Sequence, residues 1–276
     1  MTATLSAIAV AFYAFATWTL TARFRVDAGV SPTNLASVRW ALPALLLHAY
    51  VLYETVFVQG GLNLGVFNVA SLTAWTVATL MAIASFRRPI DTLGFAIWPL
   101  SCIAVGLAAA FPGTHVLGPA LGLGVRLHVV LSILAYSLLA IAACQAVLLY
   151  VLEYQLRKKR PGVLLRTLPP LQIQEGLLIQ LIGLGFFLLS LSLISGVMFV
   201  QDFLAQHLVH KTILSIVAWA VFGGLLWGRW RHGWRGRTLT RWCIAGFVVL
   251  VLAYFGSKLV LEMVLGRSWA GAAIGV

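Results

Sequence analysis

Charged residues are scarce in this sequence: Asp, Glu, Lys and Arg make up 9% of its 276 residues, whereas 61% are hydrophobic. A water-soluble domain usually has about a quarter of its residues charged, so the composition excludes an ordinary soluble domain. Its apolar runs are continuous, unlike the alternating segments of a membrane β-barrel. The sequence therefore predicts an all-α, polytopic membrane helix bundle, with residues 1–276 forming one transmembrane domain.

Cysteine and acidic residues are also few, and each shortage excludes a class of function. The three cysteines (Cys102, Cys144 and Cys243) are scattered singly, so a thiol–disulfide transporter or a thiolate metal site is not expected. The seven acidic residues fall mostly near predicted helix ends, which argues against the buried carboxylate chain of a proton-driven transporter. The sequence has no nucleophile–base constellation, phosphate loop or metalloprotease motif. We therefore expect that the protein is not an enzyme.

The apolar runs are long enough to cross a bilayer, because a spanning helix needs about 20 residues. Hydropathy predicts eight transmembrane helices, at about 3–22, 36–58, 66–86, 92–111, 127–152, 177–200, 210–228 and 242–262. The connections between them are short, which leaves no room for a separate soluble domain.

The basic residues predict the orientation of these helices. Of the 19 Lys and Arg, 15 lie in the four connections on one side, and only Arg126, Lys211, Lys258 and Arg267 lie on the other. Because basic connections stay in the cytoplasm, we expect both termini on the outer (periplasmic) side. The net charge of +12 then indicates contact of the cytoplasmic loops with anionic lipids, and not with nucleic acid.

Ionisable groups inside a membrane are costly, so each one is a functional candidate. His48 is predicted near the middle of the second span. It either hydrogen-bonds a neighbouring helix or, if the protein binds haem, acts as an inner ligand along the route that haem takes. His128 opens the fifth span on the outer side, and His207 and His210 open the seventh there.

The fifth and seventh spans share a block of sequence. LSILAY at 131–136 and LSIVAW at 214–219 each follow a histidine by three or four residues, although chance similarity between two apolar helices is an equally good explanation. Small residues at this spacing suit close helix packing. If the two helices are neighbours, His128 and His210 are candidate axial ligands of one haem iron, and the sequence leaves open whether His207 replaces His210.

Cations and aromatic side chains near these histidines complete the candidate site. Arg126 and Lys211 are expected either to bind the two haem propionates or simply to anchor the helices at the interface. Tyr136 and Trp219 lie about two turns further along their helices. They are candidates to cover a porphyrin face, although anchoring at the membrane interface explains most of the ten tryptophans without a ligand.

A second class of function uses the second span. An ion or small-molecule transporter, or the accessory subunit of one, would work through His48 and Glu54, taken as two groups on one face of that helix. Uptake without haem would favour this class.

Three stretches resemble the cytochrome c assembly proteins of the CcsA/CcmC haem-handling superfamily, within the eight-span branch that includes the HemX-like proteins. These are HKTILSIVAWAVFGGLLWGRWRHGWRGR at 210–237, RLHVVLSILAYSLLA at 126–140 and AYFGSKLV at 253–260. The Gly-Trp-Arg-Gly-Arg run at 233–237 is the most specific of these similarities. The second stretch resembles a histidine-containing helix start and gives His128 the position of an outer haem ligand.

The resemblance implies a multi-pass protein of the bacterial inner membrane that binds non-covalent, b-type haem at the periplasmic face between the fifth and seventh helices. Its expected partners are haem and other cytochrome c assembly or membrane proteins. Where the family has a tryptophan-rich motif, this chain has QDFLAQHLVHK. The resemblance therefore implies haem binding more directly than haem delivery.

Overall fold

The structure is a computed structural model that describes residues 1–26, 35–58, 61–87, 90–112, 116–117, 122–159, 168, 170–199 and 206–256, with the side chains at 23–26, 36, 116–117 and 206–210 outside this description. Its long helices are α1 (Thr2–Val26), α2 (Ala36–Val56), α3 (Val66–Ser85), α4 (Gly94–Ala110), α5 (Leu123–Arg157), α7 (Leu171–Phe199), α8 (Gln206–His232) and α9 (Gly236–Val251). A 3₁₀ turn, η1 (Asp91–Leu93), precedes α4, and a π-helical segment, η2 (Leu252–Gly256), continues α9.

Each of the eight predicted spans overlaps one of these helices, and the predicted helical membrane class is confirmed. The last part of the eighth predicted span, 257–262, lies outside the described residues. Seven of the helices in the described part of the chain are long and apolar enough to cross a bilayer. The exception is α2, because Arg39, His48 and Glu54 lower its apolar character. The structure therefore does not establish the predicted count of eight.

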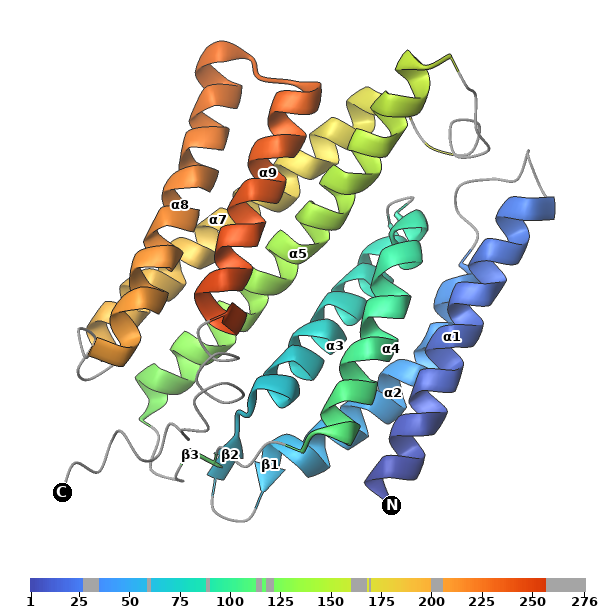
Figure 1. The fold of residues 1–276 in the computed structure, drawn as a ribbon, viewed down its shortest axis with the longest axis vertical. Helices are drawn as coiled ribbons and strands as arrows, with labels where there is room; N and C mark the ends of the chain where they lie inside the picture. The colour runs from blue at the N-terminus through green and yellow to red at the C-terminus, as the bar shows by residue number, and fades with distance from the viewer. Residues whose placement is uncertain are drawn as a thin grey trace.

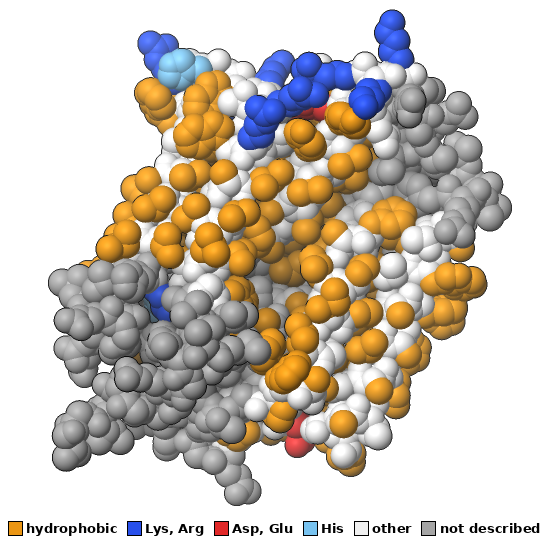
Figure 2. Space-filling model, viewed as in Figure 1, with side chains coloured by type: hydrophobic (Ala, Val, Ile, Leu, Met, Phe, Trp, Pro, Cys, Tyr) orange, Lys and Arg blue, Asp and Glu red, His pale blue; other side chains and the backbone are white. Residues whose placement is uncertain are grey.

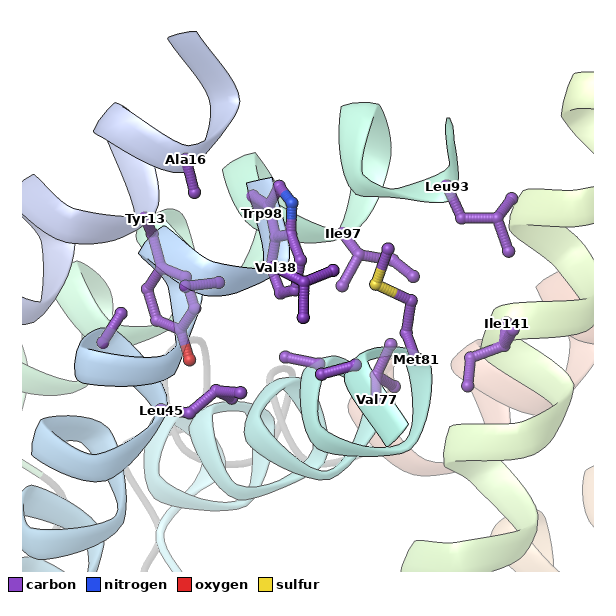
Figure 3. Packing of buried hydrophobic residues seen from close by; sticks show 14 of the residues in the cluster. Tyr13, Ala16, Val38, Leu45, Val77, Met81, Leu93, Ile97, Trp98 and Ile141 are labelled. Atoms are coloured by element: carbon purple, nitrogen blue, oxygen red, sulfur yellow. The ribbon is translucent and has the colours of Figure 1, made fainter. Parts of the chain in front are cut away.

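The helices form two groups of four (Figure 1). Helices α1–α4 pack around one apolar core, and α5, α7, α8 and α9 pack around another. Figure 3 shows the first core, in which Trp98, Val38 and Met81 fill the space between helices and Ile141 approaches from α5. Helix α5 packs against α3 and so joins the two groups.

The mostly helical fold also contains one small sheet, which the sequence does not predict. Three short strands, β1 (Phe57–Val58), β2 (Gly61–Asn63) and β3 (Val116–Leu117), form an antiparallel sheet in the order β1-β2-β3. Strands of two or three residues are too short to produce a periodic pattern in the sequence. The sheet joins the α2–α3 connection to the α4–α5 connection.

The two ends of the bundle differ in charge. Lys and Arg side chains gather at the end where α5 finishes and α8 meets α9 (Figure 2), which we call the basic end. The strands lie at the opposite end, where α1, α3 and α5 begin (Figure 1), and we call it the sheet end. The sequence predicts this separation of charge. In the structure, the start of α5, which carries His128, lies near the sheet end.

Candidate functional site

His128 is held by the helix next to its own. The Nδ1 atom lies 2.9 Å from the carbonyl oxygen of Ser192 and 3.1 Å from the hydroxyl oxygen of Ser195, both on α7. Because a carbonyl only accepts hydrogen bonds, Nδ1 carries the proton and donates it to Ser192. The other ring nitrogen, Nε2, is then the one with a lone pair, and it has no hydrogen-bond partner among the described residues. A histidine prepared to ligate a metal has this arrangement.

Small residues on α7 make room for the ring. A Cβ atom added at Gly196 would lie 3.0 Å from Cε1 of His128 and 3.3 Å from its Nδ1. One turn further along α5, the Ser132 hydroxyl lies 2.7 Å from that of Ser192 and bonds the His128 carbonyl. The stripe of α5 that carries His128 and Ser132 therefore faces α7, and the half-buried imidazole occupies a fixed position.

The start of α8 reaches α5 through η2. The Lys211 ammonium lies 5.3 Å from the centroid of the Tyr254 ring, which in turn meets the Tyr136 ring edge-on at a centroid distance of 6.0 Å. Tyr136 donates its hydroxyl hydrogen to the carbonyl of Leu250. Lys211 and Tyr136, two predicted site residues from distant segments, are thus brought together around Tyr254.

The other predicted residues at this end are Arg126, His207 and His210. Arg126 is exposed on α5, two residues before His128. The side chains of His207 and His210 lie outside the described residues, although both positions belong to the first turns of α8. Their roles stay predictions.

Trp219 faces a different side of α7 from His128. Its indole N–H donates to the Ser190 hydroxyl at 2.8 Å, and its ring stacks on Phe186 with centroids 5.5 Å apart. Ser190 and Ser192 are two residues apart and so lie on nearly opposite sides of the helix. The structure thus places Trp219 in the α7–α8 contact and not beside His128.

His48 is fully buried and links three helices. Its Nδ1 atom lies 3.2 Å from the Tyr13 hydroxyl on α1, and its Nε2 lies 2.8 Å from the Ser71 hydroxyl on α3. The Tyr13 ring also stacks on Trp98 at 6.0 Å. Both nitrogens of this imidazole are therefore occupied, as in the hydrogen-bonding alternative that the sequence left open.

The transporter alternative required His48 and Glu54 to share a face of α2, and this expectation is wrong. The two residues are six positions apart, which places them about 120° apart around an α-helix. His48 is buried, whereas Glu54 is exposed.

The Gly-Trp-Arg-Gly-Arg run forms the turn between α8 and α9 at the basic end. Gly233 and Gly236 adopt positive φ angles of 67° and 54°. Glu175 on α7 accepts a hydrogen bond from the Gly236 amide at 2.9 Å and lies 3.8 Å from Arg229, which also donates to the Trp234 carbonyl at 2.8 Å. The run is thus a fixed structural corner at the basic end, whereas α5, which carries His128 in its first turns, begins at the opposite end (Figure 1).

Replacing Gly236 by alanine tests how much this corner contributes to stability. A positive φ costs a residue with a Cβ atom about 1–2 kcal/mol, and the new Cβ would lie 2.7 Å from Oε1 of Glu153. We expect Gly236→Ala to lower the thermal unfolding temperature in detergent. Gly224→Ala in α8, which meets no atom within 4 Å, is the control and should be neutral or slightly stabilising. Equal unfolding temperatures for the two variants would contradict a strained turn.

Sequence reasoning missed Ser192, Ser195 and Gly196, which fix the His128 ring, and Tyr13 and Ser71, which bind His48. Nothing distinguishes these residues from other small or polar residues of membrane helices in the sequence. A group of three or more potential metal-ligating side chains does not occur within the described ranges. Of the two candidate histidines whose surroundings the structure describes, His48 has partners at both ring nitrogens, whereas His128 has them only at Nδ1.

Comparison with known proteins agrees with the resemblance seen in the motifs. The family model described as cytochrome C assembly protein matches residues 40–265. The inner membrane protein YpjD of Escherichia coli K12 is 34% identical over 226 residues, which is 81% of this chain and 86% of that protein. Protein HemX of Brevibacillus brevis is 26% identical over 77% of this chain and 82% of its own length.

A shorter similarity extends to a cytochrome c biogenesis protein. CcsA of Gloeothece citriformis is 29% identical over 101 residues, which is 36% of this chain and 31% of that protein. No solved structure matches the chain. Because the family model covers most of the sequence and a relative above 30% identity covers four-fifths of it, the chain belongs to the cytochrome c assembly protein family.

Proposed function

We propose that this protein binds haem in the bacterial inner membrane and carries it without changing it chemically. The haem is a non-covalent, b-type group held at the sheet end. In this proposal the sheet end and both termini face the periplasm, the basic end faces the cytoplasm, and α2 is the eighth span despite its polar residues. The family match, the relatives named for the inner membrane and for cytochrome c biogenesis, and the one-sided charge support this arrangement.

The observation that carries the proposal is the hydrogen bond from His128 Nδ1 to the Ser192 carbonyl at 2.9 Å. It fixes the tautomer, because it assigns the proton to Nδ1 and leaves the Nε2 lone pair available. It also fixes the ring plane, since Gly196 lies directly against the imidazole. The surroundings of His128 therefore fit an iron ligand. The surroundings of His48 fit a packing histidine, because both of its ring nitrogens have hydrogen-bond partners.

Haem would supply an iron that two histidines could hold, so the proposal includes a second imidazole beside that of His128. His210 is the proposed second ligand, and His207 is the alternative candidate, since both belong to the start of α8. The contact of Lys211 with Tyr254, next to Tyr136 of α5, supports an approach of this segment to α5.

The haem propionates need cations, and Arg126 and Lys211 are the proposed partners. Both lie within two residues of a proposed ligand. Tyr136 is the proposed aromatic neighbour of the porphyrin. Trp219 is left out, because its ring and its N–H are engaged on another side of α7.

His48 has a place in this proposal only along the route by which haem arrives, because its nitrogens are occupied by Tyr13 and Ser71. The partners proposed are other cytochrome c assembly or membrane proteins. They would receive haem from the periplasmic face, or supply it to that face.

A spectrum of the purified protein tests the proposal directly. We expect the chain, purified from haem-replete cells, to show a Soret band. Gly196→Ala should weaken haem binding about tenfold, as changes around a ligating histidine commonly do, because the new methyl group displaces the imidazole. The matched control is Gly183→Ala on the same helix, where an added Cβ meets no atom within 4 Å. A wild-type protein without haem, or equal haem affinity in both variants, would contradict the proposal.

A further inference from the structure

A second surface lies at the basic end and has no part in the haem proposal. Its members are tryptophans and arginines of α8, α9 and the turn between them: Trp227, Trp230, Arg231, Arg235, Arg241 and Trp242. We call this the Trp–Arg surface. Trp230 is 83% exposed, Trp227 57% and Trp242 41%, although tryptophan is normally among the more buried side chains. In Figure 2, Lys and Arg side chains lie at this end with apolar side chains directly beside them.

Several exposed residues of α8 lie on one side of the helix. Trp227, Trp230 and Arg231 are related as i, i+3 and i+4, so they are neighbours on one side of the helix. Ile216, eleven residues before Trp227 and therefore on the same stripe, is also exposed. Along this stripe the surface changes from aliphatic to indole to guanidinium as it approaches the basic end.

The turn joins this face to α9. The half-buried Trp234 lies close to Trp242, with ring centroids 5.5 Å apart, and close to His232, with centroids 6.3 Å apart. An added Cβ at Gly228 would meet the Trp234 ring at 2.5 Å, so this indole is pressed onto α8. The exposed groups of α8 and α9 are therefore held in fixed relation to each other.

The arginines of this region divide into two sets. Arg229 points inward, where it binds Glu175 and the Trp234 carbonyl. Arg231, Arg235 and Arg241 are exposed, and they form no hydrogen bond or ion pair with any residue that the structure describes. Glu175 is engaged with Gly236 and Arg229. Three guanidinium groups are thus presented outward without an acidic partner in the described part of the chain.

We infer that the Trp–Arg surface binds the headgroup of an anionic phospholipid. Guanidinium groups bind phosphate oxygens in pairs. Indole rings prefer the boundary between acyl chains and headgroups, because they have an apolar body and a polar N–H. The order aliphatic, indole, guanidinium along α8 matches the order acyl chain, interface, phosphate in a lipid. A free phosphate ion would use the arginines but would leave the exposed indoles without a function.

Native mass spectrometry of the full-length protein, released from nanodiscs of mixed phosphatidylglycerol and phosphatidylcholine, tests this inference. We expect the wild-type protein to retain phosphatidylglycerol in preference to phosphatidylcholine. The triple variant R231Q/R235Q/R241Q should lower this preference about tenfold, since each cation near a membrane surface contributes to anionic lipid binding. Excess inorganic phosphate should not displace the lipid.

The end of α5 offers a matched control. Arg157, Lys158 and Lys159 are three exposed cations of the basic end that lie outside the Trp–Arg surface. The variant R157Q/K158Q/K159Q should keep the lipid preference. Equal losses in the two triple variants would show that any positive charge suffices, and displacement by phosphate would show a simple anion site. Either result overturns the inference.

A further variant protects the test against misfolding. W227L/W230L keeps every charge and changes only side chains that are more than half exposed, so we expect a folded protein with reduced lipid retention. Unchanged retention in this variant would also overturn the inference. Haem content is measured on the same samples, and its presence or absence bears on the proposed function alone.

Discussion

His128→Ala is expected to reduce bound haem to less than about a tenth of the wild-type amount, because His128 would hold the iron and α5 contains no second histidine. The Ser192 carbonyl accepts the hydrogen bond from His128. It cannot take the place of the imidazole nitrogen as a ligand of the iron. Haem per protein is measured from the Soret band and by pyridine haemochrome. Free imidazole added to the variant should restore part of the band, since the space left against Gly196 has the shape of the missing ring.

His232→Ala is the control for this prediction. His232 is an exposed histidine at the basic end, where its ring meets Trp227 at a centroid distance of 5.1 Å, and it should leave haem content unchanged. Equal haem in His128→Ala and wild type would refute the assignment of His128. Parallel measurements on His210→Ala and His207→Ala identify the second ligand, because only its loss should change the bis-histidine spectrum.

The second large effect is expected on stability, at His48. Its imidazole is fully buried and bonded to Tyr13 and Ser71 on two other helices. His48→Ala removes both hydrogen bonds, leaves two hydroxyls without this partner and opens a cavity. Together these effects should cost about 2–4 kcal/mol. The free energy of unfolding in mixed micelles measures this loss.

Leu46→Ala provides the comparison on the same helix. Leu46 is 74% exposed, so its truncation should change stability by less than about 0.5 kcal/mol, as for most exposed positions. If His48→Ala proves as stable as Leu46→Ala while its haem content falls, His48 is a haem ligand and not a helix link. If stability falls and the remaining folded protein still binds haem, the linking role holds.

The positions of the helices could be predicted from the sequence because bilayer thickness imposes a length on each apolar run. Seven of the described helices meet this requirement, and α2 does not, because its polar residues lower its apolar character. Helix α5 runs to Arg157, beyond the predicted end at 152, since its backbone hydrogen bonds can continue past the hydrocarbon region without cost.

The neighbours of each helix could not be predicted in the same way. The shared block at 131–136 and 214–219 favours direct packing of α5 on α8, whereas α5 packs along α7 and α9, and α8 packs against α9 and α7. Ser132, the serine of the first block, accordingly hydrogen-bonds Ser192 of α7. Small residues permit close approach to any helix with a compatible surface, so their spacing identifies a packing face but not the partner.

The sequence by itself therefore determined the membrane class, the helical segments, the one-sided charge and the family, because these depend on composition and on residues adjacent in the chain. Only the tertiary structure decided which histidine has a nitrogen available. His128 and His48 are both single histidines in apolar helices. One has its Nδ1 fixed by a carbonyl 64 residues away, and the other has both nitrogens occupied by hydroxyls from two further helices. Such partners come together only when the helices pack, and no local pattern in the chain records which side chains will then lie within hydrogen-bonding distance.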